Sequence, residues 1–281
     1  MQGNLKFFAA RKEGALPPLF YVCFYRFPGA QMTSGKSKAF ILHLCVSGIT
    51  IGLAAATVLR WYTYTFLQLA GGTPLLLLLV GVDAVLGPFL TLIVYRAEKT
   101  KKEKVIDITV IGVLQISALL YGLWTFYVAR PVYLIFEYQR MALVTAADLT
   151  QEDLQKAPAE LRKMPVAGPQ LLSLRDFKSA AEQYDSVMLA MSGQSQAAQP
   201  NLWQSYEAGR VQLLEIAKPL SALSGALFTA SRMDTLVAQS GLSKDQLKYL
   251  PLLARQGDWI ILIDSTTAEP KGILALDGTK Q

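Results

Sequence analysis

The chain has 281 residues, of which 52% are hydrophobic and 17% are charged, and its formal net charge is +6. An average soluble domain carries about 25% charged residues, so this composition indicates a membrane protein with a soluble part attached. It excludes a disordered chain, which needs low hydrophobicity and high charge. It also excludes a disulfide scaffold, since Cys23 and Cys45 are the only cysteines and none follows residue 45.

The positive charge belongs to the first half of the chain. Residues 1–129 carry a net charge of +7, whereas residues 130–281 carry −1. The first half is also the hydrophobic half, so the basic excess indicates membrane orientation rather than a surface that follows phosphates. We therefore expect no nucleic-acid partner.

The first 31 residues carry turn signals but no helical period. The apolar stretch 19–27 is too short to span a bilayer, and no small-residue cleavage site follows it before the next apolar run. One interpretation is a poorly ordered tail, and the other is that translation begins at Met32. We expect residues 1–38 to form a cytoplasmic N-terminal tail, of which residues 1–31 are not translated in the second interpretation.

Three apolar stretches are long enough to cross a bilayer, which takes about 20 residues. They cover approximately residues 39–59, 74–95 and 108–128, and the second contains five consecutive leucines, Leu75 to Leu79. A single such stretch is compatible with a buried core helix, but three close together with almost no internal charge are not. The sequence therefore predicts three N-terminal transmembrane α-helices within residues 39–129.

Lys and Arg residues flank these stretches unequally. Eleven precede the first stretch or lie between the second and third, while Arg60 alone lies between the first and second. Short loops rich in Lys and Arg stay cytoplasmic, so the N-terminus is expected inside and residues 130–281 in the periplasm. Aromatic residues at the outer edge predict an interfacial belt made of Trp61, Tyr62, Tyr64, Trp124, Tyr127 and Tyr133.

Residues 130–281 suffice for one compact domain, and their patterns predict an α+β fold, a small antiparallel sheet with helices packed against it. Strands are expected at 132–137, 140–145 and 170–174, and a hairpin is expected to join 259–263 to 272–276. Helices are expected at about 204–217 and 232–239. Ser243 and Gln246 form a capping-box pattern that opens the turn carrying Leu247 and Leu250.

An amphipathic helix is expected to follow Asp176. Its apolar residues recur at helical spacing, which predicts a stripe that packs on a core. These residues are Phe177, Ala180, Ala181, Tyr184, Val187, Met188 and Met191. A loop rich in small and polar residues follows at 192–200.

Reactive side chains are scarce in the predicted periplasmic domain. His43 is the only histidine and lies near the inner end of the first stretch, which excludes a Ser-His-Asp site or a His/Cys zinc site in residues 130–281. The chain has no phosphate loop, dinucleotide fingerprint or HExxH motif. Carboxylates such as Asp148, Glu152 and Asp153 fit helix starts better than catalysis. We expect no enzyme activity, no metal and no cofactor, and we expect His43 to be an interfacial polar residue.

Asp83 is the exceptional residue of the second stretch. A carboxylate at that depth costs on the order of 3 kcal/mol by insertion scales, so it normally faces protein and has a partner. Gly81, Gly87 and Pro88 around it permit close helix approach and a kink. Two interpretations stay open: a hydrogen bond that joins the three helices, with Thr50 or Gln115 as the partner within the chain, or a contact with the transmembrane helix of another protein.

The sequence also resembles the type IV pilin accessory protein family (the TfpX/TfpZ-like proteins) over about residues 32–276. The resemblance rests mainly on GVDAVLGP at 81–88 and ARPV at 129–132, supported by KSKAFILHL at 36–44, LQISALLYG at 114–122 and YLPL at 249–252. It implies a multi-pass protein of the bacterial inner membrane that helps a type IV pilin subunit reach or persist in its assembly-competent state. It implies no catalytic residues, and residues 1–31 do not resemble the family.

Other classes of function remain open from the sequence. One is a periplasmic signal-sensing or transport-associated membrane protein, which would need a separate partner because no cytoplasmic segment is large enough for an output domain. Another is a membrane enzyme that uses carboxylates alone. The expected partners are a type IV pilin subunit and membrane lipid, while the pilin served and the oligomeric state do not follow from the sequence.

Overall fold

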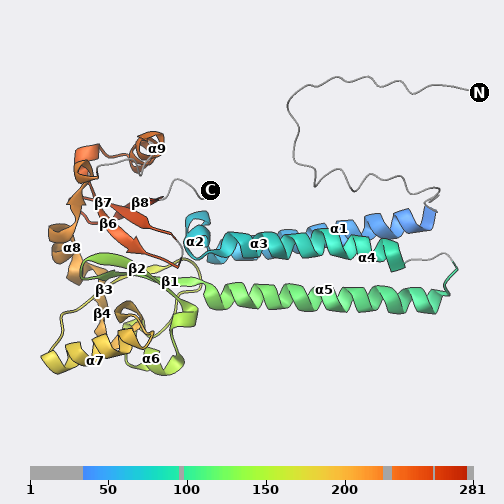
Figure 1. Cartoon of the computed structure of the whole chain (residues 1–281), viewed down its shortest axis with the longest axis horizontal. Helices are drawn as coiled ribbons and strands as arrows, with labels where there is room; N and C mark the ends of the chain where they lie inside the picture. Colours follow the sequence, from blue (N-terminus) through green and yellow to red (C-terminus); the bar gives the residue numbers. More distant parts are fainter. Residues whose placement is uncertain (1–33, 95–97, 224–229, 256, 277–281) are drawn as a thin grey trace, which may run out of the picture.

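A computed structural model of the chain describes residues 34–94, 98–223, 230–255 and 257–276 (Figure 1). The predictions for residues 1–31 and for a start at Met32 lie outside the described residues. Within the described part, three long helices extend from one side of an α/β domain. The predicted order, with transmembrane helices first and a mixed α and β domain after them, is confirmed.

The three helices have the length and composition of membrane spans. They include Phe40–Trp61, Gly72–Thr91 and Lys101–Ala129, with mean hydropathies of 1.9, 2.0 and 1.8. Helix α1 covers Ser34–Trp61, and α5 covers Lys101–Ala129. The second span is composite: α3 (Gly72–Gly81), a π-helical turn η3 (Val82–Leu86) and α4 (Gly87–Val94) follow one another. The chain is thus a membrane protein with a soluble domain.

A short helix that the sequence analysis did not predict links the first two spans. Helix α2 covers Tyr64–Leu69 and lies against the domain (Figure 1). Leu69 is fully buried in the same apolar cluster as Leu134 and Phe136 of the domain. The loop between the spans therefore supplies a side chain to the core of the domain.

The domain contains one eight-stranded mixed sheet. The strands are β1 (Pro131–Glu137), β2 (Arg140–Thr145), β3 (Gln170–Leu174), β4 (Trp203–Ser205), β5 (Lys218–Pro219), β6 (Leu247–Leu253), β7 (Trp259–Asp264) and β8 (Pro270–Ala275). Their order is β4-β3-β1-β2-β6-β7-β8, and β5 pairs with β6. The β1–β2 pair is antiparallel, but β3 runs parallel to β1 and β6 runs parallel to β2. The expected small, antiparallel sheet is therefore wrong in size and in strand direction.

Strand β1 lies in the interior of this sheet, between β3 and β2, and is buried along its whole length. Successive residues point to opposite faces. Tyr133 and Ile135 join an apolar cluster with Leu172 and Trp203, whereas Leu134 and Phe136 join the second cluster with Leu69. Because both faces of β1 are covered, its sequence is a continuous apolar run rather than an alternating one.

Helices cover both faces of the sheet and its β8 end (Figure 1). They are α6 (Gln151–Gln155), α8 (Arg210–Ile216) and α9 (Ala230–Ser240), whereas α7 (Ala180–Met191) contacts the 3₁₀ turn Gln196–Ala198. Leu236 and Val237 of α9 pack on the cluster that contains Ile260 and Leu262 of β7. The predicted hairpin 259–276 and the predicted helix at 232–239 are confirmed, whereas the helix expected from residue 204 begins at Arg210, after β4 and a 3₁₀ turn (Tyr206–Gly209).

The capping box at Ser243 and Gln246 is present, but the segment after the box differs from the prediction. The box closes one 3₁₀ turn, Lys244–Gln246, and Leu247 and Leu250 lie on strand β6. Both leucines are buried against neighbouring strands. The capping box needs only this one turn, and pairing with neighbouring strands determines the conformation of the residues that follow it.

Helix α7 is present but faces the opposite way from the prediction. The stripe expected on a core is exposed at Tyr184, Val187, Met188 and Met191. Polar groups anchor the helix instead, because Gln199 Nε2 donates to the carbonyl of the buried Ser186 at 2.9 Å. Helical periodicity identifies residues that share a face, but it does not identify which face is covered.

A polar anchor also fixes the start of α7. Arg175 donates from Nη2 to Glu182 Oε1 at 2.6 Å and from Nη1 to Oε2 at 3.0 Å. The backbone N–H of Lys178 donates to the same carboxylate at 2.6 Å. These hydrogen bonds, with that of Arg175 first, lower the pKa of Glu182 to about 2. Glu182 is thus held as a carboxylate over the physiological pH range.

The expected aromatic belt is only partly a surface feature. Tyr64, Trp124 and Tyr127 are exposed beside the domain end of the bundle. Tyr62 is buried and its hydroxyl donates to the carbonyl of Phe126 at 2.8 Å. Tyr133 is buried in the sheet. The two buried tyrosines therefore hold the structure together instead of facing the interface.

Candidate functional site

A polar cluster joins the three spans inside the apolar bundle. His43 of α1 is its centre: its Nδ1 lies 2.8 Å from Thr91 Oγ1 of α4, and its Nε2 lies 2.8 Å from Gln115 Oε1 of α5. The Thr91 hydroxyl also lies 3.1 Å from the carbonyl of Gly87, as donor. His43 is thus hydrogen-bonded to one side chain from each of the other two spans, in a medium that offers no water as a substitute.

Gly87 makes this cluster possible. A Cβ atom at this position would lie 2.0 Å from Gln115 Nε2 and 2.9 Å from His43 Nε2. Any larger residue would therefore push both side chains away. The absence of a side chain at Gly87 thus leaves room for Gln115 and His43 beside α4, and the neighbouring Pro88 is buried.

The hydrogen bonds predicted for Asp83 within the chain are not formed. Gln115 is bonded to His43, and the Thr50 hydroxyl donates to the carbonyl of Ser47 at 3.0 Å. The side chain that joins the spans is His43, which the sequence analysis placed at an interface. A signal for this face was present, since Asp83, Gly87 and Thr91 recur every four residues and so share one side of a helix.

Asp83 is buried and incompletely paired. Its side chain is only 4% exposed, and its Oδ1 has no hydrogen-bond partner among the described residues. It lies in the π-helical turn Val82–Leu86, just before Pro88. Proline lacks the N–H that the preceding turn needs, and π turns often occur at functional sites. In place of the kink expected near Pro88, the helix thus forms this π-helical turn, which carries Asp83.

A groove beside Asp83 runs between the second span and α5. Its volume is about 330 Å³, and apart from Asp83 it is mainly apolar. Leu78 and Tyr121 on its rim are largely exposed, so the groove opens to the surroundings of the bundle. Its walls meet at Gly122, where an added Cβ would lie 2.2 Å from Leu79 Cδ1. At membrane depth such a groove can hold a lipid chain or part of another helix.

Gly81 does not perform the role expected of it inside the chain. An added Cβ there would meet nothing within 4 Å among the described residues. The close approach predicted at Gly81 is therefore absent from the bundle itself. The position instead leaves open space immediately before the turn that carries Asp83, on a partly exposed part of the span.

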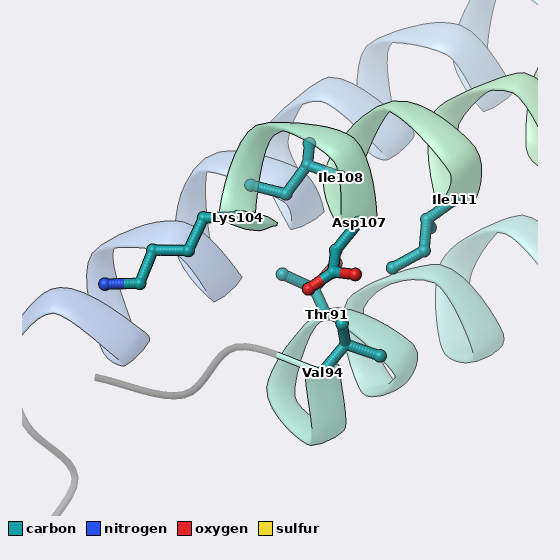
Figure 2. A pocket seen from close by; sticks show the side chains of 6 residues that line it. All are labelled: Thr91, Val94, Lys104, Asp107, Ile108 and Ile111. Carbon is teal, nitrogen blue, oxygen red and sulfur yellow. The ribbon is translucent and has the colours of Figure 1, made fainter. Parts of the chain in front are cut away.

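The opposite end of the bundle holds a small space between α4 and α5. Figure 2 shows Asp107 pointing from α5 toward Thr91 and Val94 of α4. The cavity has a volume of about 10 Å³, which is about the room for one water molecule. Lys99 donates to Asp107 Oδ2 at 2.5 Å, so this carboxylate is paired, unlike Asp83. Asp107 thus has a structural role at this end of the bundle, beside the contact between α4 and α5.

The arrangement as a whole is suited to binding through hydrogen bonds. Among the described residues, no group of three or more His, Cys, Asp or Glu side chains could hold a metal ion. The bundle combines a satisfied polar cluster at His43, an unsatisfied carboxylate at Asp83 and an apolar groove beside it. The fold and this site define a class: a three-span membrane protein whose extramembrane α/β domain is fixed to its helices.

Comparison with known proteins gives the family within that class. The chain is 32% identical over 228 residues to the fimbrial assembly protein of serogroup I from Dichelobacter nodosus, covering 80% of this chain and 88% of that protein. It is 31% identical over 219 residues to the serogroup E1 protein of the same organism, covering 77% and 85%. The chain therefore belongs to the family of these fimbrial assembly proteins. No family model and no solved structure matches it.

Proposed function

We propose that this chain is a pilin-dedicated accessory protein of the inner membrane that supports the stability or assembly of a type IV pilin subunit. The observation that carries the proposal is the similarity to fimbrial assembly proteins over most of both chains. The architecture fits such a role, because a membrane-held subunit offers both a transmembrane helix and a globular head. The protein has a helix bundle and a rigidly attached domain with which to contact each of them.

The groove at Asp83 is our candidate contact for the subunit's transmembrane helix. Lipid tails can fill the apolar part of the groove but offer no hydrogen-bond donor to a carboxylate. Another helix can offer both an apolar surface and a donor. Because His43 and Gln115 already satisfy each other, Asp83 is free to serve this purpose. The chain then acts by binding and without catalysis.

The proposed topology places the N-terminus in the cytoplasm and the domain in the periplasm. The unequal distribution of Lys and Arg supports it. A reporter that is active only in the periplasm should be active when fused after Gln281 and silent when fused near Lys102. The opposite pattern would contradict this orientation.

Deletion of the gene tests the function directly. We expect the deletion strain to lose pilin abundance or surface piliation, and the full chain to restore it. Measuring pilin by immunoblot and pili by electron microscopy separates loss of the subunit from loss of assembly. A deletion strain with normal pilin and normal pili would contradict the proposal.

Two single substitutions distinguish the partner contact from internal stability. Asp83→Leu removes an unpaired carboxylate and a burial cost on the order of 3 kcal/mol, so the protein's own abundance should not fall. Its site-specific crosslinking to pilin and piliation should fall. Gln115→Leu leaves His43 without one partner, so it should lower the protein's own abundance.

A conservative variant then reports on the charge. Asp83→Asn keeps the shape and a hydrogen-bonding group, and it should retain piliation if a neutral hydrogen bond is sufficient. Normal crosslinking and piliation for Asp83→Leu would show that the groove is not the contact, without affecting the result of the deletion experiment.

A further inference from the structure

A second cavity lies where the membrane bundle meets the domain. Its volume is about 550 Å³, and it is lined by residues from the end of α5 and Arg130, from α6 and the turn before it, and from the segment after α6. Tyr127 and Arg130 belong to the first group, and Arg162, Lys163, Met164 and Val166 belong to the last. Because α5 ends at Ala129, this cavity lies at the domain end of the third span, where a bilayer that covers the span would place its headgroups.

The charge of this cavity has one sign. Arg130, Arg162 and Lys163 line it, and no Asp or Glu is among its lining residues. Among the described residues, none of the three cations forms an ion pair. A concave surface lined by charge of one sign attracts counter-ions, so three cations around one cavity favour an anionic ligand.

Arg130 is the most constrained of the three. It is only 5% exposed, its Nη1 donates to the Tyr127 carbonyl at 2.7 Å, and its guanidinium lies 3.9 Å from the centre of the Tyr127 ring. Its buried Nε has no hydrogen-bond partner among the described residues. A guanidinium held in place by stacking on Tyr127 and by one backbone hydrogen bond is suited to the oxygen atoms of a phosphate group.

The rim of the cavity combines exposed cations with apolar side chains. Arg162 and Lys163 are exposed, and Arg162 uses Nε to donate to the Ala157 carbonyl at 3.1 Å. Val166 is also largely exposed, and Met164 is half-buried. Cations beside apolar side chains, at the end of a membrane span, match the phosphate and the first carbon atoms of a lipid rather than a free ion.

We infer that this cavity binds the phosphate of an anionic phospholipid headgroup from the leaflet on the domain side of the membrane. The cations would neutralise the phosphate, and Met164 and Val166 would contact the adjoining glycerol and acyl atoms. The inference does not depend on the proposed function or on which side of the membrane the domain lies.

Lipid retention by the full-length protein tests the inference. The purified protein is reconstituted in nanodiscs with equal amounts of phosphatidylcholine and phosphatidylglycerol, released in mild detergent, and examined by native mass spectrometry. We expect phosphatidylglycerol to be retained in preference to phosphatidylcholine. A headgroup phosphate gains about 1 kcal/mol from each nearby Lys or Arg, about fivefold in affinity. The double variant Arg162→Gln/Lys163→Gln should therefore bind phosphatidylglycerol up to about 30-fold more weakly.

The control variant is Lys178→Gln/Arg210→Gln, which changes the net charge equally at exposed residues that do not line the cavity. It should retain phosphatidylglycerol like the wild type. Equal losses in both double variants, or a wild type with no preference between the two lipids, would overturn the inference. Displacement of phosphatidylglycerol by inorganic phosphate at equal concentration would show a site for free phosphate and would also overturn it.

Discussion

Leu69→Ala should weaken the domain although residue 69 belongs to the connection between two membrane spans. The Leu69 side chain is 0% exposed and lies in the cluster that contains Leu134 and Phe136 of β1. Truncating such a leucine removes its transfer free energy and leaves a cavity, at a cost of about 2–5 kcal/mol. A loss of about 2 kcal/mol corresponds to about 30-fold faster hydrogen exchange at those amides that become accessible only when the domain opens.

The measurement is hydrogen exchange of the β1 amides, read by mass spectrometry on the full-length protein in detergent. Leu77→Ala is the matched control, because Leu77 has the same side chain in the next helix and is 68% exposed. Its effect on β1 should be small. Equal exchange rates at β1 in the two variants would refute the reasoning that α2 completes the core of the domain.

Three further predictions concern the bundle and α7. His43→Ala breaks two interhelical hydrogen bonds, each worth about 0.6 and at most about 1.7 kcal/mol in membranes. It should therefore lower the melting temperature of the bundle in detergent. An unchanged melting temperature would contradict the role of the cluster. Glu182 has a lowered pKa, so its stabilising contribution is complete above about pH 4.5 and is lost as the pH falls toward 2. Glu182→Gln should flatten that part of a plot of melting temperature against pH, and an unaltered slope would contradict the assignment. Met191→Ser should change the stability of the domain by less than about 0.5 kcal/mol, whereas Leu172→Ser in the core should cost several times more, and a large effect at Met191 would show that the stripe is covered.

The membrane part was predicted well because its signals are local. Length and hydropathy identify a span without any knowledge of its neighbours. The hairpin at β1 and β2 and the cap at Ser243 were also predictable, since a turn or cap depends on a few adjacent residues. The sequence patterns of such local features do not depend on the tertiary contacts of the segment.

The sheet was predicted poorly because its pairing is not local. Strands β1 and β3 are parallel neighbours, although β2 and residues 146–169 separate them along the chain. One signal was present: the apolar run of β1 has no alternation, which is typical of a strand covered on both faces. That pattern predicts a central strand in a layered domain rather than a small sheet with one open face.

The sequence indicated Asp83, Gly87 and Gln115 as residues of interest, but it did not indicate the hydrogen bonds of the cluster or the part of His43 and Thr91 in it. Asp83, Gly87 and Gln115 lie at similar depths along the bundle, but Gln115 is hydrogen-bonded to His43 and not to Asp83. The sequence shows which polar groups need partners, whereas the rotation of each helix determines which groups meet. His43 was missed because its position near the end of a span allowed an explanation as an interfacial residue.

Arg130 is the only residue between helix α5 and strand β1, so the third span and this strand are directly connected and move together. The apolar part of α5, residues 108–129, is about 33 Å long at a rise of about 1.5 Å per residue, close to the roughly 30 Å of a hydrocarbon core, and the charged first turns extend beyond it. A span of this length adapts to a thinner bilayer by tilting. Because Leu69 fixes the domain to the same bundle, a tilt of α5 turns the whole sheet with it. The thickness of the surrounding bilayer thereby sets the angle at which the domain faces anything bound beside it.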